Sequence, residues 1–409
     1  MRSPSLDTML RVDSQKQYYK KITIPTSKSR ANRMLFLAAI TPGKIVLSNV
    51  PESSDVMDMI YSLKAIGLQI DIEKHQVTIN NSFPECENDS NEKIVRVECG
   101  YGGTSTRFLA ALLTLGSKTY HLEPSGHMRS RPMQEMIKPL QQLGVHVELN
   151  TENTWLEIQG PVTNKLETID VDTSRSTQFA SAIAMTMSLW GGDANPIEMS
   201  ASEDYFKMTA DCITKARQSN WVIPIDFSSL SYPIALAALK GKVEILNYTG
   251  RDHLQPDSIF IDILKEMGAH ISESESSLIV TKAEKLKGWS GDCSGFPDLV
   301  PTLCFVNSFA KESASLNKLE VLKHKECDRF EEMKTILNLF ERAFQATKDS
   351  ITTELTTIMA PFVKYHAPDD HRMIMVAALF MKMLGGGEIH NWQHIKKSYP
   401  YFFEDLANS

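Results

Sequence analysis

Several features that mark other protein classes are missing from this chain of 409 residues. Its six cysteines stand singly, with no CxxC pair, so the sequence indicates neither a zinc site nor a disulfide framework. The longest apolar run, "MIMVAALFMKML", is interrupted by Lys382 and is too short to span a bilayer. The opening stretch, "MRSPSLDTMLRVDSQKQYYKK", lacks the apolar centre of a secretory signal. We therefore expect a cytosolic protein with reduced thiols.

The chain also lacks an excess of positive charge, since its formal net charge is −7. This balance gives no general attraction to nucleic acid or to an anionic membrane, and we expect neither as a partner. An anionic ligand would therefore need a locally basic pocket. The length favours two domains, each large enough to bury a core.

One pattern recurs six times along the chain. A polar cluster opens an apolar helical segment, a short β-branched run follows, and a second polar cluster opens an amphipathic helix that often ends at glycine. The first repeat reads "SKSRANRMLFLAAI", "GKIVLSNV" and "ESSDVMDMIYSLKAIG". The repeats begin near residues 29, 104, 176, 229, 297 and 369. Six copies divide naturally into two α/β domains of three repeats each.

The polar clusters lie where a helix start offers unpaired N–H groups and a positive dipole end to an anion. If the repeats pack around a three-fold axis, these helix starts would face one cleft. The first helices supply Lys28, Ser29, Arg33, Thr104, Arg107, Ser176, Gln178, Asp298, His371 and Arg372. The second helices add Arg129, Arg131, Tyr205, Lys325, Glu326, Arg329 and Lys397. So many cations predict a substrate with several negative charges, and Asp298 and Glu326 are candidates for general base and acid.

Each of these residues also has a structural alternative. Helix capping would account for Ser29, Thr104, Ser176 and Asp369. Ordinary ion pairs would account for Arg107, Arg131 and Arg329. His371 could be a satisfied structural histidine, and Glu326 could belong to a solvated charged face. Recurrence at the same position of the repeat favours the functional interpretation over any single alternative.

The motifs "SKSRANR", "GGTSTR", "SRSTQF", "FPDLV", "KECDR" and "PDDHRM", in this order over nearly the whole chain, resemble the 5-enolpyruvylshikimate-3-phosphate synthase family. A sister family that acts on UDP-N-acetylglucosamine lacks the combination of "KExDR" and "DHRM". The resemblance implies transfer of the enolpyruvyl group of phosphoenolpyruvate to the 5-hydroxyl of shikimate 3-phosphate, with release of phosphate. It also implies a monomer of two closing domains, each of three βαβαββ repeats in an inside-out α/β barrel, with no metal or organic cofactor. The domains would be residues 25–228, and residues 1–24 with 229–409.

The resemblance also assigns roles to individual residues. The catalytic group would be Asp298, Glu326, Lys28 and His371, with Asp298 acting on the hydroxyl and Glu326 on C3 of phosphoenolpyruvate. Contacts to shikimate 3-phosphate would come from Lys28, Ser29, Arg33, Ser176, Thr177, Gln178, Ser202, Tyr205, Asp298 and Lys325. Contacts to phosphoenolpyruvate would come from Lys28, Gly103, Thr104, Arg129, Gln178, Arg329, Arg372 and Lys397.

Three positions depart from the family pattern. Tyr101 replaces the asparagine of the "NAGT" turn, His127 replaces the first arginine of the "RxxxRP" run, and Val321 replaces an asparagine before "KExDR". Arg129 could supply the charge that His127 does not hold permanently. The departures keep two alternatives open: a related enolpyruvyl transferase with another anionic acceptor, and a catalytically silent paralogue that binds phosphorylated ligands.

Overall fold

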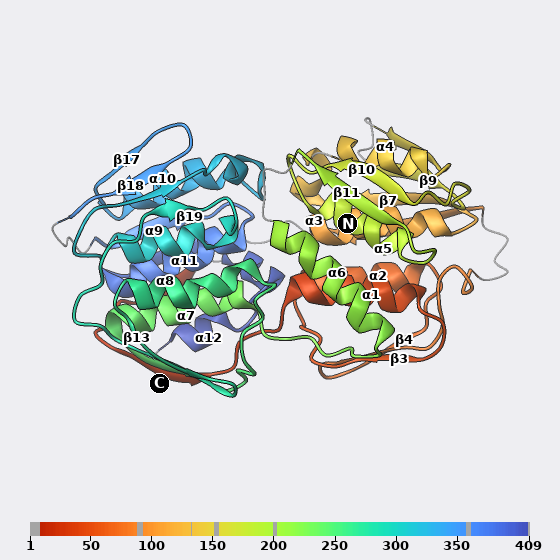
Figure 1. Ribbon diagram of the computed structural model, residues 1–409. Coiled ribbons are helices and arrows are strands. Elements are labelled where there is room, and N and C mark those ends of the chain that lie inside the picture. The colour runs from red at the N-terminus through yellow and green to blue at the C-terminus, as the bar shows by residue number, and fades with distance from the viewer. Residues whose placement is uncertain are drawn as a thin grey trace. The chain divides into compact units, whose positions relative to one another are not determined.

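The computed structural model describes residues 9–87, 93–131, 133–150, 155–198, 203–356 and 361–407. The chain forms two compact units, shown in Figure 1. Unit 1 combines Met1–Pro25 with Ile225–Ser409, and unit 2 is Thr26–Pro224. The chain passes from unit 2 back into unit 1 after Pro224, and not after residue 228 as predicted. The reason is that Asp226 caps the first helix of unit 1.

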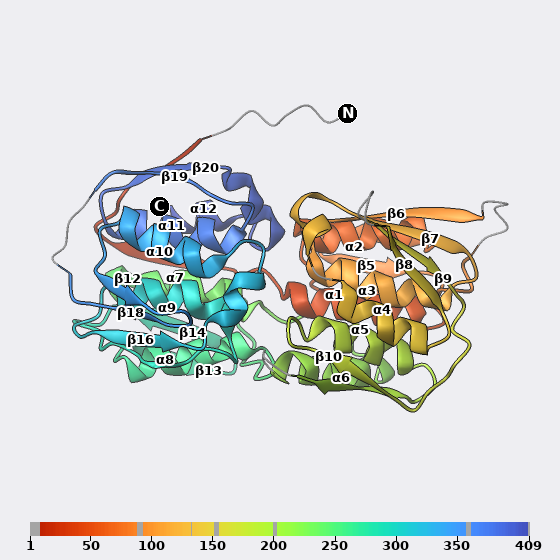
Figure 2. The same cartoon turned by 90° about the horizontal axis from the view of Figure 1, so that it is seen from above.

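Each unit is built around three central helices (Figure 2), and polar residues named above lie at or near their N-terminal ends. In unit 2 these are α1 (Lys28–Ile40), α3 (Gly103–Leu112) and α5 (Gln178–Met187). In unit 1 they are α7 (Phe227–Lys240), α9 (Val300–Asn307) and α11 (His371–Met383). Every residue of α3 and α9 is buried. Burial of so much apolar surface is the main stabilisation of each unit.

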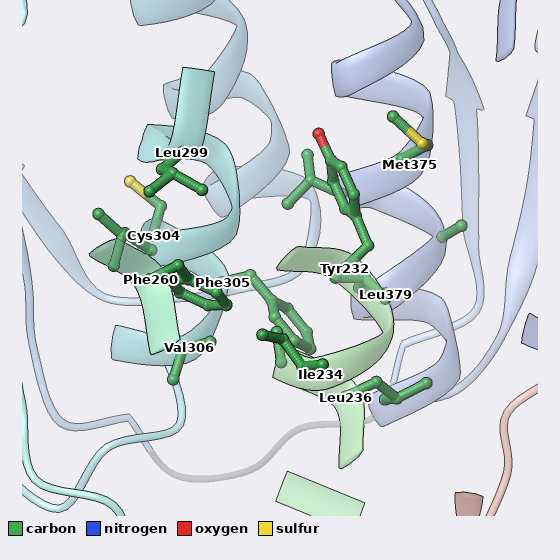
Figure 3. Packing of buried hydrophobic residues seen from close by; sticks show 14 of the residues in the cluster. Tyr232, Ile234, Leu236, Phe260, Leu299, Cys304, Phe305, Val306, Met375 and Leu379 are labelled. Atoms are coloured by element: carbon green, nitrogen blue, oxygen red, sulfur yellow. The ribbon is translucent and has the colours of Figure 1, made fainter. Parts of the chain in front are cut away.

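The core of unit 1 shows how closely these helices pack. Helices α7, α9 and α11 contact one another in all three pairs, and Figure 3 shows side chains from all three meeting. The rings of Phe305 and Phe380 lie edge to face with their centroids 5.1 Å apart, a geometry that aromatic pairs prefer. Because these helices are enclosed by protein, their polar residues can reach solvent only at the ends.

Three small sheets surround the central helices of each unit. The sheets of unit 2 contain β3 (Ile45–Leu47), β4 (Ile70–Glu73) and β5 (Gln76–Ile79); β6 (Ile94–Gly100), β7 (Thr119–Pro124), β8 (His146–Asn150) and β9 (Trp155–Gln159); and β10 (Thr168–Asp172) and β11 (Asp193–Ile197). Those of unit 1 contain β2 (Tyr18–Ile22), β12 (Gly241–Ile245), β13 (His270–Ser274) and β14 (Ser277–Thr281); β15 (Gly291–Asp292), β16 (Ala314–Asn317), β17 (Phe344–Ala346) and β18 (Ile351–Thr353); and β1 (Leu10–Val12), β19 (Val363–His366) and β20 (Gly387–His390).

The central helices act as crossovers between parallel strands. Helix α3 joins β6 to its parallel partner β7, and α5, α9 and α11 join β10 to β11, β15 to β16 and β19 to β20 in the same way. Helix α7 leads into β12, whose parallel partner β2 comes from the N-terminal segment. This pairing places the start of the chain in unit 1 and confirms the predicted α/β repeat fold.

A second helix follows in each repeat. The second helices of the repeats are α2 (Ser54–Ala65), α4 (Gln134–Gln142), α6 (Glu203–Arg217), α8 (Phe260–Glu266), α10 (Arg329–Leu339) and α12 (Phe402–Leu406). The 3-10 turns are η1 (Leu113–Leu115), η2 (Gly126–Ser130), η3 (Pro256–Ile259), η4 (Pro297–Leu299), η5 (Glu320–His324) and η6 (Trp392–Lys397). In the part of the chain that the structure describes, none of the helices has the length and apolar character needed to cross a membrane.

Gly241 lets β12 approach β2 at the end of α7. A Cβ at this position would overlap the backbone carbonyl of Tyr18, so we expect Gly241→Ala to push the two strands apart. Overpacking of this kind costs about 1 to 3 kcal/mol of the free energy of unfolding, measurable by denaturant titration. Gly295→Ala is the matched control, because a Cβ there meets nothing within 4 Å. Equal stability of the two variants would contradict this account of the β2–β12 pair.

Candidate active site

Charged side chains gather in unit 1 around the N-terminal ends of the central helices. This group, called here the unit-1 cluster, consists of Ser228, Asp298, Lys325, Glu326, Arg329, Asp370, His371, Arg372 and Lys397. The residues come from α7, η4, the loop after η5, α10, α11 and η6, so all three repeats of the unit contribute to it.

Asp298 lies between two arginines at the start of α9. Its Oδ1 accepts a hydrogen bond from Arg329 Nη1 at 2.8 Å, and its Oδ2 accepts one from Arg372 Nη2 at 2.9 Å. Lys325 Nζ is 3.6 Å from Oδ1. Such charge-assisted bonds hold the carboxylate in one orientation.

Glu326 is held by a second pair of partners. Its Oε2 lies 3.1 Å from His371 Nδ1, and its Oε1 lies 3.0 Å from Lys397 Nζ. His371 is the first residue of α11, and Lys397 ends η6. A carboxyl between an imidazole and an ammonium group has two neighbours that can exchange protons with it, which suits general acid–base chemistry.

Asp370 is the N-cap of α11. Its Oδ1 accepts a hydrogen bond from the backbone N–H of Arg372 at 2.9 Å, and its Oδ2 accepts one from Arg329 Nε at 2.7 Å. Burial opposes ionisation, but Arg329 and His371 together outweigh it and lower the pKa of Asp370. The expectation that Asp369 is also a cap is wrong, because its carboxylate instead accepts from Asn391 Nδ2.

Glu326, Asp370 and His371 offer three potential metal-ligand atoms within 4.8 Å of one another. Both carboxylates, however, already have cationic partners from the protein. Lys397 pairs with Glu326, and Arg329 pairs with Asp370. These ion pairs neutralise the group, so we interpret it as a proton-transfer site and assign no metal to it.

Unit 2 carries its own charged residues at the helix starts. Lys28 opens α1, and its Nζ forms an ion pair with Asp55 Oδ2 of α2 at 2.9 Å. The N-cap of α1 is Ser27, whose hydroxyl accepts from the N–H of Arg30, so the capping interpretation of Ser29 is wrong. The same holds for the second residue of α3, Thr104, because Gly102 occupies that cap position.

Arg33 is enclosed by unit 2 and is only 1% exposed. Its guanidinium donates to Thr209 Oγ1 at 2.8 Å, to Ser181 Oγ at 3.3 Å and to the carbonyls of Ser29 and Tyr205 at 2.9 and 3.0 Å. Burial lowers the pKa of Arg33 to about 10. In this structure the side chain therefore joins α1 to α5 and α6.

A polar chain links the starts of α3 and α5. Arg107 Nη1 donates to Gln178 Oε1 at 2.7 Å and to Ser176 Oγ at 3.3 Å, and Gln178 Nε2 donates to Thr104 Oγ1 at 2.8 Å. The guanidinium lies over the Phe179 ring, 4.6 Å from its centroid. Burial, followed by the neighbouring Arg131, lowers the pKa of Arg107.

The two candidate arginines after β7 have different surroundings. Arg129 is exposed, and its Nε donates to the carbonyl of Pro124 at 3.0 Å. Arg131 reaches the start of α3, where a Cβ on Gly103 would collide with its guanidinium. The glycine therefore makes room for Arg131. The resemblance of the motifs had assigned Arg129, and not Arg131, to phosphoenolpyruvate.

The remaining predicted residues are distributed over both units. Thr177 is the buried N-cap residue of α5, and Tyr205 is half-buried in α6. Ser202 lies outside the described residues. Of the three departures, Tyr101 packs its ring against Gly126, His127 lies in η2, and Val321 is buried in η5.

Sequence reasoning missed two functional candidates, Asp55 and Ser228, and listed Arg131 among the cleft cations without giving it a ligand. Asp55 and Arg131 stand near the start of the second helix of their repeats, and Ser228 stands at the start of a first helix. Recurrence along the repeats could have identified Asp55 and Ser228 as well. The pairing of all three with Lys28, Gly103 and Arg372 requires the folded structure.

Comparison with solved structures defines the fold. The fold matches an EPSP synthase from Acinetobacter baumannii with a TM-score of 0.77, at 21% identity over 97% of both chains. It also matches the enolpyruvyl transferase NikO from Streptomyces tendae with a TM-score of 0.74, at 13% identity over 97% of this chain and 96% of that one. The fold is thus that of the enolpyruvyl transferases.

The family model for EPSP synthase (3-phosphoshikimate 1-carboxyvinyltransferase) matches residues 12–218 and 196–406. A 3-phosphoshikimate 1-carboxyvinyltransferase of Aliivibrio salmonicida is 30% identical over 99% of both chains. One of Escherichia coli strain SMS-3-5 is 30% identical over 100% of this chain and 99% of its own length. The chain belongs to the EPSP synthase family, which confirms the resemblance seen in its motifs and the predicted transferase activity in aromatic amino acid biosynthesis.

Replacing Asp370 by Asn keeps a capping side chain but removes the buried negative charge beside Arg329. We expect a loss of about 3 kcal/mol in the free energy of unfolding at pH 7. Because folding lowers the pKa of Asp370, this contribution is fully present above the unfolded pKa of about 3.9 and is lost as pH falls through the folded value. Chemical denaturation should therefore show a constant difference from wild type between pH 7 and about pH 4.

The neighbouring variant Asp369→Asn is the control for this experiment. Its carboxylate is 46% exposed, so we expect a difference from wild type of less than about 1 kcal/mol. An Asp370→Asn difference that already shrinks between pH 7 and pH 5 would count against the ion pair with Arg329.

Proposed function

We propose that this chain transfers the enolpyruvyl group of phosphoenolpyruvate to the 5-hydroxyl of shikimate 3-phosphate and that the unit-1 cluster carries the proton transfers. The observation that supports this most directly is the pair of differently held carboxyls. Asp298 accepts from two arginines, whereas Glu326 lies between His371 and Lys397. Asp298 is thus oriented by fixed cations to act on the hydroxyl, and Glu326 has two neighbours that can exchange protons with it.

In the first step the 5-hydroxyl oxygen attacks C2 of phosphoenolpyruvate. Asp298 orients the hydroxyl and takes its proton, while the carboxyl of Glu326 delivers a proton to C3. The product is a tetrahedral intermediate that keeps the carboxylate and the phosphate on C2. Its negative charges would be stabilised by the cations of the cluster, which are already fixed by their ion pairs before substrate binds.

In the second step Glu326 removes a proton from the new methyl group at C3. The bond between C2 and the phosphate oxygen breaks, the double bond re-forms, and phosphate leaves. His371 and Lys397 contact Glu326 at 3.1 and 3.0 Å, so both can stabilise its carboxylate between the two proton transfers. The same residue can then act as acid in one step and base in the next.

Binding of phosphoenolpyruvate is assigned to cations of both units. In unit 1 its carboxylate and phosphate would take donors of Arg329, Arg372 and Lys397. These donors now pair with Asp298, Asp370 and Glu326, so substrate binding exchanges one set of anions for another. In unit 2 we assign Lys28, Gly103, Thr104, Gln178 and Arg131, with Arg131 taking the role first considered for Arg129.

The acceptor would contact residues of the first and third repeats and the catalytic carboxylate. We assign Lys28, Ser29, Arg33, Ser176, Thr177, Gln178, Ser202, Tyr205, Asp298 and Lys325 to this role. Arg33 already donates four hydrogen bonds within unit 2, so part of its contribution would come from holding α1 against α5 and α6. The polar chain from Arg107 to Thr104 would fix Gln178 and Ser176 in the same way.

Val321 motivates a second candidate, a related transferase with a different anionic acceptor. Its apolar side chain is buried and stands where the family has an amide, so it offers no hydrogen bond to a sugar-like hydroxyl. Phosphate release from phosphoenolpyruvate, measured with and without shikimate 3-phosphate, separates the possibilities. Release that requires shikimate 3-phosphate supports the leading proposal, and no release with any acceptor would support a silent paralogue.

We also propose that the chain works as a monomer in the cytosol. Family membership favours a single chain carrying a complete set of catalytic residues. Light scattering that gives a mass well above 45.9 kDa would contradict the monomer. Fractionation of the source cells would test the location.

The first functional prediction concerns the two carboxyls. We expect Glu326→Gln and Asp298→Asn each to lower kcat by about 10² to 10⁴-fold, because removal of a general acid or base typically has this effect. Phosphate release at saturating substrates measures it. Glu331→Gln is the control, since that side chain is 58% exposed and pairs only with Lys334 among the contacts found. Near-normal turnover of either test variant would exclude that residue from proton transfer.

The second functional prediction compares the two arginines after β7. Loss of a charged hydrogen bond costs about 1.5 to 3 kcal/mol, so Arg131→Ala should raise KM for phosphoenolpyruvate by about 10 to 100-fold. Arg129→Ala should change it by less than about twofold, because its side chain is exposed. Arg131→Lys should restore part of the affinity, since lysine keeps the charge but not the bidentate geometry. The reverse order of the two alanine variants would return the role to Arg129.

A further inference from the structure

The second helices of the first and fourth repeats carry an aspartate at the same position. Ser27 and Asp226 are the N-caps of α1 and α7, which sets the two repeats in register. In the first repeat, Asp55 is the second residue of α2. In the fourth repeat, Asp257 is the second residue of η3. Both side chains are buried, with 3% exposure for each residue.

The partners of these two aspartates differ. Lys28 follows the cap of α1 and pairs with Asp55 at 2.9 Å. Phe227 stands at the corresponding position of α7, so the fourth repeat provides no lysine there. Gln255 fixes η3 against this helix start, because its side chain accepts from the N–H of Phe227 at 3.1 Å and donates to the carbonyl of Ile225 at 2.8 Å. The hydrogen bonds of Gln255 to the backbone thus position η3, and Asp257 with it, without an ion pair.

The surroundings of Asp257 disfavour a carboxylate. Within the described residues its Oδ1 has no hydrogen-bond partner, and an ionised, acceptor-only group is costly to bury in that state. The charged groups that face it are Asp226 from the cap of α7, Asp298 from η4 and Arg372 from α11. Burial first, and then Asp298, raise its pKa to about 7, although Arg372 and Ser228 act in the opposite direction.

Ser228 connects this buried aspartate to the catalytic cluster. The pKa of Asp257 is lowered in part by a hydrogen bond with Ser228, whose Oγ also accepts from Arg372 Nη1. The other terminal nitrogen of Arg372 donates to Asp298 Oδ2 at 2.9 Å. A continuous row of polar groups therefore runs from Asp257 through Ser228 and Arg372 to the carboxylate that acts on the hydroxyl.

We propose that Asp257 is a positioning residue for the transfer reaction: its neutral form leaves Arg372 directed at Asp298 and substrate, and its ionised form draws Arg372 away. This inference rests on the proposed function, since it concerns the arginine assigned to phosphoenolpyruvate. Ionisation adds a negative charge behind that arginine, which weakens its attraction for the substrate anion. The protonation state of a group that never touches substrate would then set the affinity for phosphoenolpyruvate.

The test compares KM for phosphoenolpyruvate in wild type and Asp257→Asn between pH 6 and pH 8.5. Asparagine mimics the neutral acid in shape and cannot ionise. We expect the wild-type KM to rise by about tenfold above pH 7, in line with one added charge near the arginine, and the rise to be much smaller in Asp257→Asn. At pH 6 the kcat values of the two proteins should agree within about twofold.

Asp262→Asn, an exposed carboxylate on the next helix, is the control and should keep the wild-type profile. Stability gives an independent readout. Because folding raises the pKa of Asp257, the wild type loses stability relative to Asp257→Asn as pH rises from about 4 to about 7. Above pH 7 the variant should therefore have the higher melting temperature.

Two results would overturn the inference. One is a KM that rises equally with pH in wild type and Asp257→Asn. The other is an Asp257→Asn protein with lower kcat at every pH and a lower melting temperature above pH 7, which would indicate an ordinary structural carboxylate. Failure of the proposed function looks different, because the wild type itself would then release no phosphate.

Discussion

The burial of three central helices in each unit is the constraint on which the charged sites depend. Helices α3 and α9 have no solvent-facing side, so their polar residues are confined to the end where the chain enters. That end is also where backbone N–H groups lack partners within the helix. An apolar centre and a polar start are therefore two results of one packing arrangement. This explains why "APDDHRM" precedes a largely apolar segment.

Burying cations at such helix starts requires neighbouring anions. Arg329 is 2% exposed, and Asp370 and Asp298 raise its pKa despite the opposing effect of burial. In unit 2 Lys28 is balanced by Asp55 in the same way. The acids therefore serve the site twice, because they keep the cations ionised and hold them in place. A substrate anion therefore meets cations that are already placed at the helix starts, and its binding exchanges their protein partners for its own charges.

The fold was largely predictable because periodicity and capping are local signals. The predicted helix starts lie within a few residues of the observed ones, and the β-branched run "GKIVLSNV" of the first repeat contains β3. Individual caps were less predictable, since Ser27, and not Ser29, caps α1. Charged partners were the hardest, because Ser228 and Arg372 lie 144 positions apart and meet only when α7 packs against α11. Motifs gave the identity of the charged residues, but not which of them share a proton or an ion pair.

The repeats also show how one scaffold produces different electrostatics. The same position in the second helix holds Asp55 in the first repeat and Asp257 in the fourth. A single difference in the first helix, Lys28 against Phe227, gives one aspartate a cation and deprives the other of one. The first aspartate then acts as a fixed counter-ion, whereas the pKa of the second rises to about 7. The two repeats therefore place the same residue type in different surroundings: Asp55 pairs with a lysine, whereas Asp257, among the described residues, is buried without one, beside the residues assigned to the chemistry.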